Sequence, residues 1–385
     1  MASASLTTFQ DLIQHLLDYI GDDARPSGQR HTKRAILAAY RDFPTAHRWS
    51  YYYQRGRVTT VAPYKTGTVA YANSSRIVTL TGGTFPTWAA FGRITINDIN
   101  YEIATRESNT SLKLSVNSNP GADIAAGTSF TLFRDAYPMP CDFISSELLM
   151  ELNQSNWMEH STAGDWFMMN RGQQTPGTPR RYTFFADPNY VSSMAVGFWP
   201  PPDAIFNFDF IYQRRPRPLH VDRELSGTIS TTSGLAVVTG DGTKFSSDKH
   251  VGSILRISAN STDYPTGYDG ANPLEFERTI MSVASATSLT VDSNLTSALS
   301  KVKYEISDPI DVENGTMLTA FIRLCEKEIA MIRRLEDREM VAGWYLESLV
   351  MARESDSRSF ARRERDGNIS YESWLRSRPV GADVA

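Results

Sequence analysis

The side chains that most often perform catalysis or bind metals are few and scattered in this chain. Its six histidines are His15, His31, His47, His160, His220 and His250. No two of them have the HxH or HExxH spacing that brings two imidazoles to one metal ion. The two cysteines, Cys141 and Cys325, lie far apart and outside any CxxC motif. We therefore expect no metal site, no disulfide framework and no cofactor.

Two pairs of carboxylates have a spacing that a glycosidase or a Ca²⁺ site could use. Asp22 and Asp23 follow Gly21 directly, and a loop between two helices explains them. Asp263 and Asp269 lie in a Gly- and Pro-rich stretch, where aspartate is common in turns. A bound ion at this second pair stays an open alternative. The chain has no GxSxG, GxGxxG or GxxxxGK[ST] motif, and we expect it not to be an enzyme.

The composition is that of a folded protein with more than one structural unit. The chain has 385 residues, of which 41% are hydrophobic and 21% are charged. Its formal net charge is −4, which disfavours bulk binding of nucleic acid. No run approaches the roughly 20 apolar residues that span a bilayer, and the N-terminus lacks a secretory pattern. We expect a soluble protein without a membrane partner.

Two segments, residues 61–136 and 223–307, are copies of one β module. The matched positions lie 160 residues apart and include Gly67 with Gly227, Val78 with Val238 and Ile94 with Ile254. The second copy is longer because of a Gly- and Pro-rich stretch at 260–273, which predicts a surface loop. Short alternating runs separated by turn residues predict a small antiparallel barrel or sandwich of five to seven strands.

Helical patterns precede the first module. The first one has apolar residues at steps of three and four, namely Phe9, Leu12, Leu16 and Ile20. Thr8 and Asp11 have the spacing of a capping box, and Gly21 is a typical terminator. A second helix is expected over 29–43.

Between the modules, the sequence predicts both a helix and strands. Ile144, Leu148 and Leu152 would share one face of a third helix that begins at Asp142. A long loop is expected over 161–179. Alternating patterns then predict three strands, at 182–185, 194–199 and 206–212.

The segment 315–353 after the second module predicts a single long helix. Its apolar positions are Ile322, Cys325, Ile329, Ile332 and Leu335, followed by Met340 and Trp344. The fold class is therefore α+β, with a discontinuous helical core, a long C-terminal helix and two inserted, related β modules. The segments are the helical core at 1–60, 137–222 and 308–356, the modules at 61–136 and 223–307, and a C-terminal tail at 357–385.

Two charged segments are candidate interaction sites. The other face of the long helix carries both signs, and we take it as a candidate subunit interface, with a solvated face as the alternative. Its residues are Arg333, Arg334, Glu336, Asp337, Arg338 and Glu339. The C-terminal segment mixes arginines with apolar anchors and is a candidate docking arm, with a frayed tail as the alternative. Its residues are Arg358, Phe360, Arg362, Arg363, Arg365, Tyr371, Trp374 and Leu375.

Several core motifs resemble those of head-to-tail adaptor (connector) proteins of tailed bacteriophages. They are the helical run at 35–43 with the aromatic strand at 49–53, the Tyr-Pro-Met-Pro segment at 137–143, and the segment at 198–203 that leads to 212–216. The resemblance covers more than a third of the chain.

The resemblance implies a ring, usually of twelve copies, in the neck of the virion. The ring would bind the portal on one side and tail or nozzle proteins on the other, and DNA would pass through it without specific binding. The helices at 6–20, 29–43 and 312–353 would line its wall, and the segment 353–378 would reach the portal. Synthesis would take place in the cytoplasm of the host bacterium.

Three other functions stay open. The chain could be a tail or capsid-surface protein whose β modules bind host carbohydrate through Trp88, Tyr264 or Tyr268, since sugar rings stack on aromatic side chains. It could instead be a tail-completion or tail-tubular protein of the neck. A cell-wall hydrolase carried in the tail is the third, for which the carboxylates are the only support.

Overall fold

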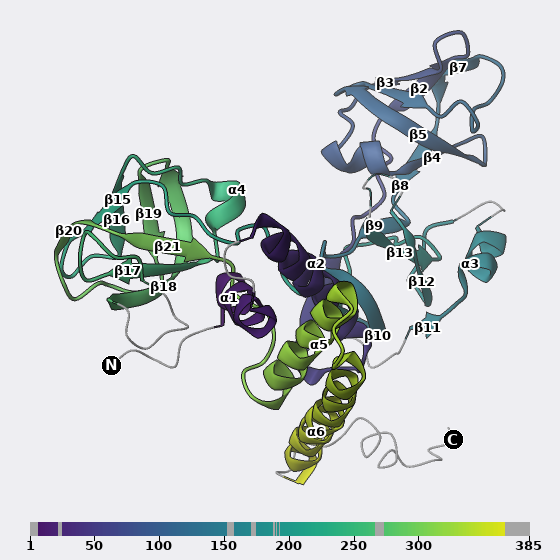
Figure 1. The fold of residues 1–385 in the computed structure, drawn as a ribbon. Helices are drawn as coiled ribbons and strands as arrows, with labels where there is room; N and C mark the ends of the chain where they lie inside the picture. The colour runs from purple at the N-terminus through teal and green to yellow at the C-terminus, as the bar shows by residue number, and fades with distance from the viewer. Residues whose placement is uncertain are drawn as a thin grey trace. The chain divides into compact units, whose positions relative to one another are not determined.

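The computed structural model of the chain is α+β, with six α-helices and several curled antiparallel sheets among the residues it describes (Figure 1). These residues are 7–21, 25–151, 158–170, 175–187, 189, 191, 193–265 and 273–365, with the backbone alone at 147–151 and 358–365. Tyr53–Arg215 forms one compact unit, and Met1–Tyr52 with Pro216–Ala385 forms the other. None of the described helices is long and apolar enough to cross a membrane.

Four helices of the second-named unit share one hydrophobic core. They are α1 (Phe9–Ile20), α2 (Pro26–Asp42), α5 (Thr316–Arg333) and α6 (Arg338–Arg365). The predicted N-terminal helix is confirmed, including the capping box of Thr8 and Asp11 and the left-handed Gly21. At the centre of the core, Phe43 stacks on Trp49 at 5.0 Å and meets the edge of Phe321 at 5.5 Å.

The prediction of one unbroken helix over 315–353 is wrong. The chain leaves α5 through Arg334, whose φ of +55° is left-handed. Arg334 N donates to Met331 O and Leu335 N donates to Ala330 O, which is the double hydrogen bond of a Schellman motif. Helix α6 then packs against α5 and continues to Arg365, beyond the expected end. The apolar spacing resumes after the turn, which is why the sequence pattern looks continuous.

The two β modules fold into seven-stranded sheets. The first consists of β2 (Thr68–Ala72), β3 (Ile77–Thr81), β4 (Arg93–Ile96), β5 (Ile99–Ser108), β6 (Ser111–Leu114), β7 (Ile124–Thr128) and β8 (Phe130–Phe133). The second consists of β15 (Thr228–Thr231), β16 (Val237–Asp241), β17 (Ile254–Ser258), β18 (Leu274–Ser285), β19 (Ser288–Val291), β20 (Leu299–Val302) and β21 (Tyr304–Ser307).

The strand order of the two sheets is the same, which confirms the repeat. It is β7-β2-β3-β6-β5-β4-β8 in the first sheet and β20-β15-β16-β19-β18-β17-β21 in the second. A short helical turn precedes the third strand of each copy: η3 (Thr87–Phe91) precedes β4, and α4 (Ser247–His250) precedes β17. The longer connection in the second copy lies between β17 and β18, where the sequence placed it.

The register of the repeat differs from the sequence alignment by one residue at β4 and β17. Ile94 pairs with Leu132, whereas Leu255 pairs with Ile306 at the same place in the second sheet. Leu255 is therefore the counterpart of Ile94, and Ile254, which the sequence matched to Ile94, lies on the opposite face. A shift of one residue in a strand exchanges its two faces.

The described regular elements of the segment 137–222 are strands, apart from one short helix, so its assignment to the helical core is wrong. Its elements are β9 (Ala136–Pro138), β10 (Phe143–Glu151), β11 (Glu159–His160), α3 (Ala163–Met169), β12 (Arg181–Ala186), β13 (Met194–Trp199) and β14 (Asn207–Arg214). With β1 (Tyr53–Thr59) they form a three-stranded sheet, β1-β14-β10, and a four-stranded sheet, β11-β12-β13-β9. Both sheets contribute to an aromatic core, in which Phe198 stacks on Phe208 at 4.7 Å.

Three local predictions in or next to this segment need correction. The third helix expected from Asp142 is strand β10, which pairs with β14. A step of four residues keeps side chains on one face of a helix and also on one face of a strand, so the spacing alone cannot distinguish them. The loop expected over 161–179 contains α3, and the aromatic strand expected at 49–53 is mostly the 3₁₀ turn η2 (Ser50–Tyr52), which follows another, η1 (Phe43–Thr45). The three strands predicted at 182–212 are confirmed.

Candidate functional site

The predicted interface residues lie at the turn between α5 and α6 instead of along one helix face. Arg333 ends α5, Arg338 and Glu339 begin α6, and Arg334, Glu336 and Asp337 form the connection. Asp337 is the least exposed acceptor among them, and its Oδ2 receives a 2.8 Å hydrogen bond from Tyr19 Oη. Burial, and then this bond, raises the pKa of Tyr19 to about 12. The turn is thereby attached to α1.

The outer face of α6 carries large apolar side chains that the sequence analysis did not single out as a surface. They are between 40% and 64% exposed and comprise Met340, Trp344, Leu346, Val350 and Met351. We call them the α6 apolar face. The inner side of α6 is also apolar, through Val341, Tyr345, Leu349 and Ala352. Apolar residues on both sides of a helix are the sequence signal for an additional partner.

A buried carboxylate of α5 contacts charged or titratable side chains from α1 and α5. Glu326 of α5 is 4% exposed and accepts from His15 Nε2 at 2.9 Å and from Arg323 Nη1 at 2.6 Å. The Arg323 guanidinium also lies 5.4 Å from the ring centre of Trp344 in α6. Burial by itself would raise the pKa of Glu326, but the two hydrogen bonds outweigh it and hold the pKa below its ordinary value.

This lowered pKa predicts a loss of stability in acid. Above the ordinary pKa of glutamate the stabilisation is fully present, and it disappears as the pH falls through the lower, folded-state pKa. We expect Glu326→Gln to cost about 1–2 kcal/mol at pH 7 and progressively less as the pH falls below the ordinary pKa of glutamate, measured by urea unfolding over a series of acidic pH values and at pH 7. Glu336→Gln, an exposed change in the turn, is the control and should behave as the wild type. An equal cost of Glu326→Gln at all of these pH values would contradict the prediction.

The predicted docking residues divide into two groups. Arg358, Phe360, Arg362, Arg363 and Arg365 belong to the last turns of α6, where the structure describes the backbone. Tyr371, Trp374 and Leu375 lie outside the described residues. The start of the segment is therefore a continuation of a helix, and its role in docking stays a prediction.

The histidine, aspartate and cysteine side chains considered as possible catalytic or metal-binding groups mostly make structural contacts within the fold. His47 Nε2 lies 3.1 Å from Asp356 Oδ2, and His250 Nδ1 accepts from Ser246 N at 3.0 Å. Asp263 accepts from Thr262 within its own turn, while Asp269 is outside the described residues. Within the described part of the chain, no three His, Cys, Asp or Glu side chains gather as metal ligands would. Cys325 is buried in α5, which raises the pKa of its thiol.

Of the aromatic residues proposed for sugar stacking, the structure describes Trp88 and Tyr264. Trp88 is half-buried against the core of the first module. Tyr264 has two cations over its ring, with Arg223 at 5.9 Å and Lys303 at 5.2 Å from the ring centre. Tyr268 lies outside the described residues.

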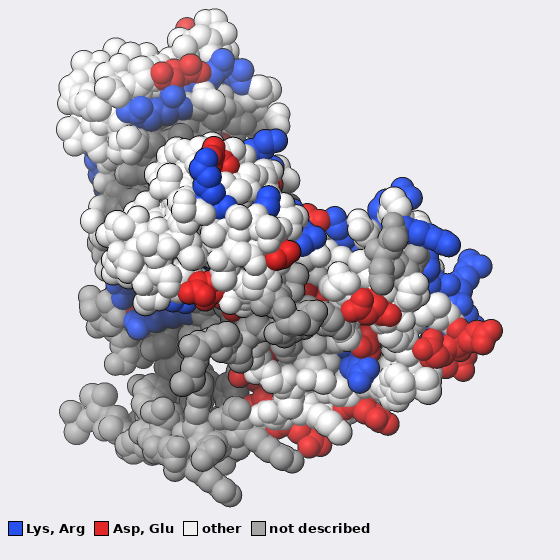
Figure 2. Space-filling model, turned by 60° about the vertical axis from the view of Figure 1, so that its left-hand side comes forward, with Lys and Arg blue, Asp and Glu red and all other residues white. Residues whose placement is uncertain are grey.

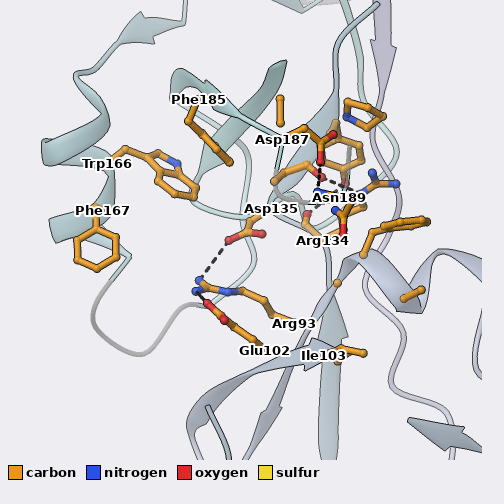
Figure 3. A pocket seen from close by; sticks show the side chains of 17 residues that line it. Arg93, Glu102, Ile103, Arg134, Asp135, Trp166, Phe167, Phe185, Asp187 and Asn189 are labelled. Atoms are coloured by element: carbon orange, nitrogen blue, oxygen red, sulfur yellow. Dashed lines mark hydrogen bonds and ion pairs between the residues drawn. The ribbon is translucent and has the colours of Figure 1, made fainter. Parts of the chain in front are cut away.

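A different cavity, of about 340 Å³, lies within the Tyr53–Arg215 unit (Figure 3). Module strands β4 and β5 contribute Arg93 and Glu102 to it, and α3 contributes Trp166 and Phe167. A second cavity of about 540 Å³ shares these four residues with the first. The two cavities therefore adjoin each other, and we call them together the α3 groove.

Three charged side chains that line the α3 groove, Arg93, Asp135 and Glu102, are linked to one another through Arg93. Arg93 lies between two carboxylates, with Nη1 3.3 Å from Asp135 Oδ2 and Nη2 3.1 Å from Glu102 Oε1. Burial raises the pKa of Asp135, and the charge of Arg93 offsets this only in part. The neighbouring Arg134 donates from Nε to Ala136 O at 2.7 Å and lies over the rings of Phe91 and Tyr137. Both guanidinium groups are therefore already engaged.

No protein-family profile, curated protein or solved structure matches this chain.

Proposed function

We propose that this chain is a structural protein of the virion neck that assembles with further copies of itself into a ring between the phage portal and the tail. The α6 apolar face carries the proposal. In soluble monomers, large contiguous apolar patches are rare, and such patches mark interaction sites. The α6 apolar face places five large, exposed apolar side chains on a span of twelve residues of one helix.

A second copy is the occupant that fits this face best. Its apolar residues alternate with exposed groups of both signs, Glu347, Arg353 and Glu354. Protein interfaces commonly combine large apolar side chains with charged ones. The turn residues Arg334, Glu336 and Glu339 are exposed next to it and also carry both signs. In a ring, each subunit presents two different surfaces, and charges of both signs allow them to complement each other.

The charge distribution is compatible with a channel that DNA crosses without being held. On the face shown in Figure 2, small groups of basic and acidic side chains are interspersed among uncharged residues. Strong sequence-independent binding of DNA requires clustered Lys and Arg. Together with the net charge of −4, this distribution supports passage more than binding.

The test is the mass of the purified full chain in solution. We expect native mass spectrometry to show a closed oligomer, alone or with the portal protein of the same phage, and top views by electron microscopy to give its subunit number. The double variant Val350→Glu/Met351→Glu should be monomeric, because it replaces two side chains of the α6 apolar face with charged ones that would be buried in the contact.

Val191→Glu/Ile205→Glu is the matched control. Both residues are exposed apolar side chains, 97% and 66%, and belong to the other unit. This variant should retain the oligomer. A wild type that stays monomeric even with the portal, or a ring that survives the α6 double variant, would refute the proposed assembly.

A further inference from the structure

The α3 groove has features of a preformed ligand-binding site. Trp166 is fixed by its neighbours, since its ring lies 5.1 Å from that of Phe185 and both rings cover Gly197 of β13. A Cβ at Gly197 would lie 2.7 Å from Phe185 and 2.8 Å from Trp166, so the close approach requires glycine. The indole Nε1 is buried, and no hydrogen-bond partner is found for it among the described residues.

Phe167 is the exposed member of the aromatic wall. It is 62% exposed and lines both cavities of the groove. Thr162 holds the start of α3 by accepting from Asp165 N at 3.1 Å. Figure 3 shows Trp166 and Phe167 on one side and Asp135, Arg93 and Glu102 next to them. An exposed aromatic ring beside fixed polar groups is typical of ligand sites.

The polar lining distinguishes between classes of ligand. An anion would need a free cation, but Arg93 and Arg134 are both engaged. Of the carboxylates, Asp135 and Glu102 both contact Arg93, which weakens their attraction for a cation. The rest of the polar lining combines two further carboxylates, Asp98 and Asp187, with amides and a hydroxyl from Asn100, Asn117, Asn170, Asn189 and Ser118, all of which can accept hydrogen bonds from hydroxyl groups. Such groups suit a neutral ligand with many hydroxyls.

We propose that the α3 groove binds a short neutral oligosaccharide. The apolar face of a sugar ring would pack on Phe167, and its hydroxyls would donate to Glu102 and exchange hydrogen bonds with the asparagines. Each cavity falls within the roughly 300–1,000 Å³ range of small-molecule sites. This activity would be additional to ring formation and does not depend on it.

The experiment uses the full chain and four defined probes. Maltotriose, cellotriose, mannotriose and triacetylchitotriose are each tested by saturation-transfer NMR and titration calorimetry. We expect at least one to bind. Phe167→Ala should weaken that binding about tenfold or more, because the variant removes the exposed aromatic surface. Glu102→Gln should also weaken it, since the carboxylate is the stronger acceptor.

Met168→Ala is the matched control, because Met168 is 63% exposed on the same helix but lines neither cavity. It should bind as the wild type does. Unchanged unfolding midpoints would show that the variants are folded. The proposal is overturned if none of the four saccharides binds, if neither Phe167→Ala nor Glu102→Gln weakens binding, or if trilysine competes for the same site.

Discussion

Replacing Arg256 with methionine is expected to lower the free energy of unfolding of the unit that contains it by about 3–5 kcal/mol. Arg256 is 1% exposed in β17, and its Nη1 and Nη2 each lie 2.7 Å from an oxygen of Asp11 in α1. Its Nε also donates to Glu277 Oε2 at 2.9 Å. Without the guanidinium, two poorly hydrated carboxylates remain uncompensated. Urea unfolding at pH 7 measures the effect.

Two further variants separate charge from packing at this site. Asp11→Asn combined with Arg256→Met should recover part of the loss, because one of the stranded charges is removed while the cap can still accept from Thr8 N. Lys33→Met removes a half-exposed ion pair with Asp222 in the same unit and should cost less than about 1 kcal/mol. A loss below about 1 kcal/mol for Arg256→Met would contradict the prediction.

Alanine at Gly227 is expected to destabilise the second module by about 2–5 kcal/mol. Gly227 has a φ of +85°, and a Cβ there would lie 2.3 Å from Asp241 O of the neighbouring strand. Left-handed backbone costs about 1–2 kcal/mol for other residues, and overpacking against backbone adds about 1–3 kcal/mol. The unfolding midpoint in urea and the onset of proteolysis within 223–307 measure the loss.

The repeat supplies a second test and a control for this prediction. Gly67, the counterpart in the first module, has a φ of +91° and the same close approach, 2.4 Å to Thr81 O, so Gly67→Ala should be comparably destabilising. Gly234 has a φ of +82° but nothing within 4 Å of its Cβ position. Gly234→Ala should therefore cost only the backbone strain. Equal losses for Gly227→Ala and Gly234→Ala would show that the close contact is unimportant.

The sequence predicted those elements whose signals are local. Helix α1 could be read completely because Thr8, Asp11 and Gly21 determine its ends within one turn. The relation between the modules was visible because matching turns recur at a constant spacing. The strands at 182–212 followed from alternation over a few residues.

Other features depended on partners that are distant in the sequence. Residues 143–151 form a strand because β14, more than fifty residues later, offers its edge for pairing. The end of α5 at Arg334 uses a non-glycine residue in left-handed backbone, which propensity does not predict. The two β modules are shifted by one residue at β4 and β17 relative to their sequence alignment. This shift could be seen only from the pairing of β17 with β21.

The candidate sites also combine features that have local sequence signals with features that depend on residues distant in the sequence. The sequence by itself determined that the chain contains a repeated β module, an N-terminal helix and widely separated chemical groups. Only the tertiary structure decided that α6 exposes an apolar face, because the opposite side of that helix is buried against α5. It likewise brought Arg93, Asp135 and Trp166 into one groove, since contacts across a fold are set by packing and strand pairing, which no local pattern encodes.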